Sequence, residues 1–228
     1  MSAVADYGRA FALWRDSAPE AWEAYTRHRF VRALGDGSLP RSAFLHYLKQ
    51  DYVFLVHYSR AWALAVAKSA SLAEMKVAAT TVDALVNHEM RLHVEVCAAE
   101  GISEAQLFEV REAPQNLAYT RYVLDSGYSG GFLDLMAALA PCAMGYGEIG
   151  LALASEASSD AYRPWIDTYA GGEYQDVCSG IGAMIDAALE ERLGPRFADA
   201  PCWIALCRTF RTAAELEAGF WDMGLEGA

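Results

Sequence analysis

The stretch APCAMGYGEIG, residues 140–150, is the most informative part of this chain. Its three glycines, Gly145, Gly147 and Gly150, match the pattern G-x-G-x-x-G, which binds dinucleotides when it stands at a strand-to-helix turn. Here the glycines lie inside a run of apolar and small residues typical of a helix. We therefore reject a nucleotide site. We interpret the glycines as positions where another helix packs closely, although each interior glycine costs about 1 kcal/mol.

The same stretch contains a candidate nucleophile. Cys142 and Tyr146 are four residues apart, so in a helix they share a face and present a thiol and a phenol to one pocket. A cysteine among alanines is more often part of the core than a catalytic group. Whether Cys142 has a chemical role therefore depends on the rest of the chain.

The rest of the chain is punctuated at helix spacing and almost lacks the alternating pattern of strands. Pro19 and Pro40 suit first-turn positions of helices, and the segment 35–37 (GDG) suits a helix end. Ser71 is a candidate cap, and Ser103 with Gln106 forms a capping box. The expected helices span about 41–69, 71–100, 114–126, 130–156, 160–168, 174–192 and 198–222. We predict an all-α fold, a bundle of about eight to ten helices.

Composition limits the class of protein. With 228 residues and 54% hydrophobic residues, the chain has enough apolar surface for one domain over residues 1–228. A formal net charge of −12 argues against binding to nucleic acid or to anionic membranes. The N-terminus does not resemble a secretory signal, and Asp134 and Glu148 interrupt the most apolar run, residues 130–155. We expect a soluble cytoplasmic protein with no membrane partner.

Metal and disulfide chemistry are not indicated. The five cysteines are odd in number and form no Cys-x-x-Cys pair, which argues against a disulfide framework and a thiolate metal site. His88 and His93 are five residues apart, about 140° around a helix, so they are poorly placed to bind one ion. We predict no metal and no cofactor. Glu89 and His93, four apart, are expected to form a hydrogen-bonded pair.

Several polar residues stand in stretches that otherwise suit a core. Asp51 lies between YLKQ and YVFLV, and Glu217 lies in ELEAGFW, residues 215–221. Tyr119 and Tyr169 add phenols near helix ends. Burying a carboxylate is costly unless something offsets the cost, so these residues are candidates for a site, although each also has an ordinary structural interpretation.

Taken together, these segments resemble the TenA or thiaminase II family, also called aminopyrimidine aminohydrolases. The resemblance keeps its order and spacing over some 190 residues. It includes HRFVRALGDGSLP (28–40), FLHYLKQD (44–51), EMRLH (89–93), Pro141-Cys142 with Tyr146 and Gly150, WIDTYAGG (165–172), and Glu217 with Phe220-Trp221.

The resemblance implies an all-helical fold like that of haem oxygenase but without haem, usually a homotetramer. It also implies a pocket for a small aminopyrimidine or thiamin. The implied reaction is hydrolysis at the exocyclic methylene on C5 of the pyrimidine. The family's nucleophilic cysteine corresponds to Cys142, its catalytic acid to Glu217 and its pyrimidine-holding aspartate to Asp51. Its pocket tyrosines correspond to Tyr119, Tyr146 and Tyr169.

One position departs from the family pattern. Three residues after the aspartate the family commonly has a tyrosine that assists the cysteine, whereas this chain has Phe54. A cysteine with a pKa of about 8.5 is only a few per cent thiolate at pH 7, so we expect a working but slower enzyme. The main alternative is a non-catalytic pyrimidine-binding or regulatory protein. Salvage of aminopyrimidine and cleavage of thiamin also stay open.

Overall fold

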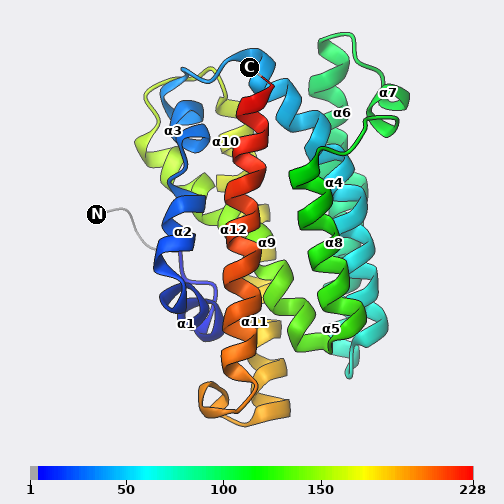
Figure 1. The fold of residues 1–228 in the computed structure, drawn as a ribbon, viewed down its shortest axis with the longest axis vertical. Helices are drawn as coiled ribbons and strands as arrows, with labels where there is room; N and C mark the ends of the chain where they lie inside the picture. The colour runs from blue at the N-terminus through cyan, green and yellow to red at the C-terminus, as the bar shows by residue number, and fades with distance from the viewer. Residues whose placement is uncertain (1–4, 228) are drawn as a thin grey trace. The chain divides into compact units, whose positions relative to one another are not determined.

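The computed structural model describes residues 5–227, apart from the side chain of Leu92. Within this range the chain is all-α and contains no strand, as predicted (Figure 1). The helices are α1 (Arg9–Ser17), α2 (Pro19–Thr26), α3 (Arg29–Asp36), α4 (Arg41–Lys68), α5 (Leu72–Ala84), the π-helical turn η1 (Leu85–Glu89), α6 (Met90–Ala99), α7 (Glu104–Phe108), α8 (Pro114–Ser129), α9 (Phe132–Glu156), α10 (Arg163–Ala170), α11 (Gly172–Leu193), the 3-10 turn η2 (Phe197–Asp199) and α12 (Trp203–Glu226).

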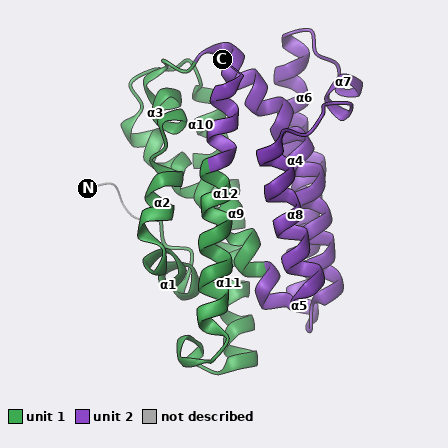
Figure 2. Cartoon of the chain, viewed as in Figure 1, with its two compact units in different colours: residues 1–39, 136–218 green, residues 40–135, 219–228 purple. Residues whose placement is uncertain are grey.

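The described chain forms two compact units (Figure 2). Unit 1 comprises residues 5–39 and 136–218, and unit 2 comprises residues 40–135 and 219–227, as far as they are described. Both units are discontinuous in sequence, because α9 and α12 each contribute to both. The interpretation of residues 1–228 as one domain stays a prediction.

Unit 2 is organised around α4, which contacts α5, α6, α7 and α8. The helix is apolar around much of its circumference, and Tyr47, Leu48, Ala61 and Trp62 are all at most 1% exposed. A helix with this pattern is stable only when neighbours cover it on several sides. The arrangement therefore places the middle of α4, which contains Asp51, in the core.

Unit 1 contains most of α9, and the three glycines of the opening stretch lie inside this helix. A methyl group added at Gly145 would meet the Tyr25 ring, and one at Gly147 would meet the Tyr7 hydroxyl. At Gly150 it would lie 2.5 Å from the main chain of Tyr169. The interpretation of these glycines as close-packing positions is confirmed, because a side chain at each would collide with a neighbour.

The first helix of unit 1, α1, is capped from far away in sequence. The carboxylate of Asp186, on α11, accepts hydrogen bonds from the main-chain N–H groups of Arg9 (2.8 Å) and Ala10 (2.7 Å). The first N–H groups of a helix have no partner within it, and a carboxylate there also interacts favourably with the helix dipole. Asp186 therefore ties α1 to α11.

Most predicted helix ends are confirmed within a few residues. Ser71 caps α5 by accepting from the Glu74 N–H, and Ser103 with Gln106 forms the predicted capping box. Pro40 precedes the first turn of α4 instead of lying in it. The expected helix 71–100 contains a π-helical turn at Leu85–Glu89, and residues 5–227 form twelve α-helices instead of eight to ten. The difference arises partly from the short helices near the N-terminus.

Helix α9 is long and apolar enough to cross a membrane by length and composition alone. In the structure, however, 89% of its most apolar window is buried inside the protein. Such burial is typical of a core helix of a globular protein.

Candidate functional site

Asp51 is buried in unit 2, with 3% of its surface exposed. The hydroxyl of Tyr47, one turn earlier on α4, donates a hydrogen bond to its Oδ2 atom (3.0 Å). The Nε2 atom of His93 lies 2.6 Å from the same oxygen. These partners offset the cost of burying a carboxylate.

His93 is completely buried, and its second ring nitrogen, Nδ1, lies 3.0 Å from the main-chain carbonyl of Glu89. Burial by itself lowers the pKa of His93, but the hydrogen bond and charge of Asp51 outweigh burial and raise it overall. The expected pairing of residues 89 and 93 therefore exists, although it uses the main chain of Glu89. The partnership with Asp51 was not predicted, because residues 42 positions apart meet only through the packing of α6 on α4.

Aromatic rings gather around Phe54, one turn after Asp51 on α4, in unit 2. The ring of Phe54, one turn after Asp51, stacks on the ring of Tyr119 from α8, with centroids 4.9 Å apart and an angle of 30°. The ring of Phe220 meets Phe54 edge-on at 5.4 Å. The structure thus brings Phe54 and Tyr119 into contact, with Asp51 one turn before Phe54 on α4, and all three residues are buried.

A second set of predicted residues gathers in unit 1. Cys142 and Tyr146 lie one turn apart on α9 and are 7% and 4% exposed. The ring of Tyr146 lies 5.0 Å from that of Tyr169 on α10. Trp165 contacts both rings, at 5.9 Å and 4.6 Å. Tyr146, one turn after Cys142, therefore belongs to an aromatic cluster with Trp165 and Tyr169.

The aromatic cluster of unit 1 contains two members that sequence reasoning did not assign. Trp165 lies in the stretch WIDTYAGG but received no role, and Tyr174 follows it on α11. The ring of Tyr174 contacts that of Tyr169 at 4.9 Å, and its hydroxyl donates to the carbonyl of Ala143 (3.1 Å). The four-residue spacing of Trp165 and Tyr169 on one helix was the available signal for the first of them.

Glu217, the predicted acid, lies on α12 within unit 1 and is only 1% exposed. Glutamate is rarely buried to this extent unless it is paired. This burial agrees with the sequence analysis, which selected Glu217 because its stretch suits a core. The chemical roles of Glu217 and of the other site residues stay predictions.

Within the described residues, no three or more His, Cys, Asp or Glu side chains gather in a way that would hold a metal ion. All five cysteines are thiols, and Cys97, Cys142 and Cys178 are buried.

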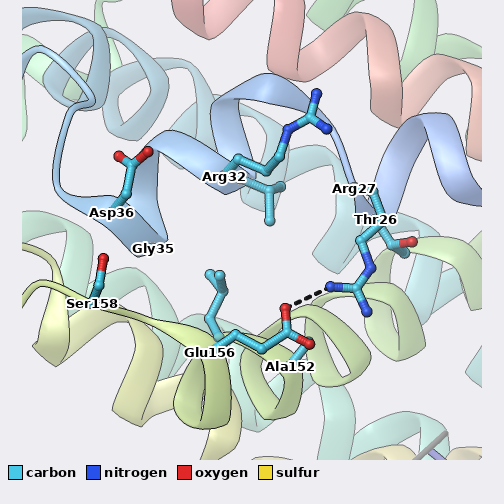
Figure 3. A pocket seen from close by; sticks show the side chains of 10 residues that line it. Thr26, Arg27, Arg32, Gly35, Asp36, Ala152, Glu156 and Ser158 are labelled. Carbon is cyan, nitrogen blue, oxygen red and sulfur yellow. Dashed lines mark hydrogen bonds and ion pairs between the residues drawn. The ribbon is translucent and has the colours of Figure 1, made fainter. Parts of the chain in front are cut away.

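A cavity of about 160 Å³ opens elsewhere in unit 1, between α3 and the end of α9 (Figure 3). An ion pair between Arg27 and Glu156 crosses its wall at 2.8 Å. Val31, Gly35 and Leu153 also line it. The cavity is lined by none of the predicted site residues.

The amino-acid sequence of this chain is similar to those of proteins of one known family. A family model described as the TENA/THI-4/PQQC family matches residues 15–227. The aminopyrimidine aminohydrolase of Halalkalibacterium halodurans is 37% identical over 94% of this chain and 94% of its own. Sequence similarity thus extends over both clusters.

Solved structures show the same architecture. A protein described as a TenA family transcription regulator from Silicibacter sp. TM1040 is 60% identical, with a TM-score of 0.95 over 96% of this chain and 97% of its own. A domain from Shewanella denitrificans with a heme oxygenase-like fold has a TM-score of 0.70 at 12% identity, over 96% of this chain and 92% of its own. The predicted haem-oxygenase-like, all-α fold is confirmed.

Proposed function

Because this chain belongs to the TENA/THI-4/PQQC family, we propose that it is a hydrolase of thiamin salvage. Its substrate is aminomethylpyrimidine and its product is hydroxymethylpyrimidine (4-amino-5-hydroxymethyl-2-methylpyrimidine). The relative from Halalkalibacterium halodurans named aminopyrimidine aminohydrolase supports this proposal. Thiamin, which carries the same pyrimidine, is a second candidate substrate.

The observation that carries the proposal is the burial of the groups that this chemistry needs. Asp51, Cys142 and Glu217 are 3%, 7% and 1% exposed. Two carboxylates in the interior are costly unless they have partners or a function that retains them. A nucleophile, an acid and a ring-orienting acceptor are the three groups required to displace an amine from the methylene on C5.

In the proposed reaction, Cys142 and Glu217 each act at defined steps. The thiolate of Cys142 adds to C6 while the acid of Glu217 gives a proton to N1, and the ring loses its aromaticity. Electrons then move from N1 through the ring and expel ammonia from the C5 methylene, and the N1 proton returns to Glu217. Water adds to the methylene as Glu217 again protonates N1.

The last step regenerates the enzyme. The thiolate leaves C6, N1 returns its proton to Glu217, and the proton lost by water is taken up by ammonia. Overall, the alkylammonium substrate and water become the alcohol and an ammonium ion. Asp51 accepts a hydrogen bond from the 4-amino group, and the rings of Phe54, Tyr119, Tyr146 and Tyr169 are proposed to hold the pyrimidine faces.

One assay tests the proposal. The purified protein is incubated with aminomethylpyrimidine and, separately, with thiamin, and hydroxymethylpyrimidine is quantified. We expect turnover by the wild type, loss of at least about 100-fold in Cys142→Ala and in Glu217→Gln, and near-normal turnover in the control Cys97→Ala, a second buried cysteine. Equal, negligible rates for wild type and Cys142→Ala on both substrates would overturn the proposal.

A regulatory or pyrimidine-binding protein is the second candidate, because the 60% identical structure is described as a transcription regulator. This candidate predicts tight binding of hydroxymethylpyrimidine without turnover. It also predicts that Cys142→Ala leaves the affinity for pyrimidine unchanged. Homotetramer formation and a cytoplasmic location stay predictions, to be checked by light scattering and cell fractionation.

A further inference from the structure

The two oxygens of Asp51 are used unequally. Tyr47 and His93 both form their hydrogen bonds with Oδ2, at 3.0 Å and 2.6 Å. Among the described residues, Oδ1 takes part in no hydrogen bond. One oxygen is therefore anchored by the protein, while the other keeps its capacity to accept.

The orientation of His93 is determined by its second nitrogen. Nδ1 lies 3.0 Å from the main-chain carbonyl of Glu89. Because a carbonyl only accepts, Nδ1 must carry a hydrogen. The other nitrogen, Nε2, then shares a proton with Oδ2 of Asp51, so the buried pair holds one proton between its facing atoms and has no net charge.

The π-helical turn explains why His93 reaches α4. Within Leu85–Glu89 the chain takes one residue more per turn, and the N–H of Met90 bonds to the carbonyl of Leu85. One inserted residue rotates every later side chain by about 100° around the helix axis. The turn thus sets which face of α6 meets α4, and it also supplies the carbonyl that holds the imidazole.

We propose that His93 is a positioning residue for substrate recognition, acting through Asp51. By holding Oδ2, His93 and Tyr47 fix the carboxylate in one rotamer and direct Oδ1 to accept from an N–H group of the substrate ring. His93 itself does not touch the substrate. This inference rests on the proposed function, since it assigns Asp51 to ring binding.

Two substitutions of similar polarity test whether His93 positions Asp51 or only stabilises the folded protein. In His93→Gln the side-chain amide nitrogen lies near the position of Nε2 and donates to Asp51. In His93→Asn the shorter amide keeps the bond to the Glu89 carbonyl but does not reach Asp51. Both variants are neutral, and thermal unfolding establishes that each is folded. His88→Asn is the control, because His88 is an exposed histidine on the same helical segment.

The readouts are the Kd for hydroxymethylpyrimidine by calorimetry and the separate kcat and KM for aminomethylpyrimidine. We expect His93→Asn to raise Kd and KM by about 10- to 100-fold with a smaller change in kcat, because a hydrogen bond to a charged group is lost. His93→Gln is expected to restore Kd to within about threefold of wild type, and His88→Asn to match wild type.

Each outcome is decisive. A folded His93→Asn protein that binds pyrimidine as wild type does overturns the positioning role alone and leaves the proposed function standing. Equal loss in the Gln and Asn variants also overturns it, because the rescue fails. Absence of both pyrimidine binding and turnover in the wild type overturns the proposed function, and the inference with it.

Discussion

The ring of Phe54 stacks on the ring of Tyr119 with their centroids 4.9 Å apart. This contact joins α4 to α8. Phe54 lies one turn after Asp51 on α4, and its ring has no hydroxyl. Where the family commonly has a tyrosine, this chain therefore keeps the aromatic ring and its packing but lacks the hydroxyl.

Restoring the hydroxyl tests whether position 54 limits the rate. We expect Phe54→Tyr to raise kcat for aminomethylpyrimidine by about 3- to 10-fold, because the family pattern has at this position a tyrosine that assists the cysteine. The measurement is steady-state turnover at pH 7. Phe44→Tyr, which adds a hydroxyl at another buried position of α4, is the control. Unchanged turnover in Phe54→Tyr would show that this position does not limit the reaction.

The His93–Asp51 pair predicts how stability depends on pH. Because the pKa of His93 is raised in the folded protein, the folded state binds more protons than the unfolded state between the ordinary value, about 6.5, and the raised one. The contribution of His93 to the free energy of unfolding is therefore fully present below about pH 6.5. It is lost as the pH rises through the raised pKa.

Urea unfolding of wild type and His93→Gln from pH 5.5 to pH 9 measures this contribution. The difference between the two proteins is expected to shrink as the pH rises. His88→Gln, at an exposed histidine of the same helical segment, is measured alongside as the control. A His93→Gln difference that stays constant or grows with pH would contradict the assigned direction.

The cap on α1 predicts a local stability effect. Removing the carboxylate in Asp186→Ala leaves the N–H groups of Arg9 and Ala10 without their partner. We expect a loss of about 1–2 kcal/mol in the free energy of unfolding, the usual cost of losing a helix cap. Asp176→Ala, at an exposed position of the same helix α11, is expected to change stability by less than about 0.5 kcal/mol.

Two glycines give opposite predictions for the same substitution. In Gly150→Ala the new methyl group would lie 2.5 Å from the main chain of Tyr169, so α9 and α10 must move apart at a cost of about 1–3 kcal/mol. In Gly180→Ala nothing lies within 4 Å of the new methyl group. There we expect a gain of about 0.5–1 kcal/mol, because alanine is the better helix former. Thermal unfolding of both variants provides the comparison.

The fold class and most helix boundaries could be predicted from the amino-acid sequence, because these depend on local features. Ser71 and Ser103 cap the predicted helices, and Gly37 ends α3 in the left-handed conformation with φ of 77°. The buried positions of Asp51 and Glu217 were also evident, since a carboxylate stands out within an apolar run. Their order and spacing with Cys142 were sufficient to identify the family.

Which of these side chains meet depends on how the helices pack, and it could not be predicted from the sequence. No local rule links Asp51 to His93, because their contact requires α6 to pack on α4, and the π-helical turn at Leu85–Glu89 changes which face of α6 points there. The stacking of Phe54 on Tyr119 and the cluster of Tyr146, Trp165 and Tyr169 likewise join residues from different helices. Helix formation is governed by neighbouring residues, whereas the hydrogen-bond partner of a buried carboxylate is chosen by the packing of distant segments.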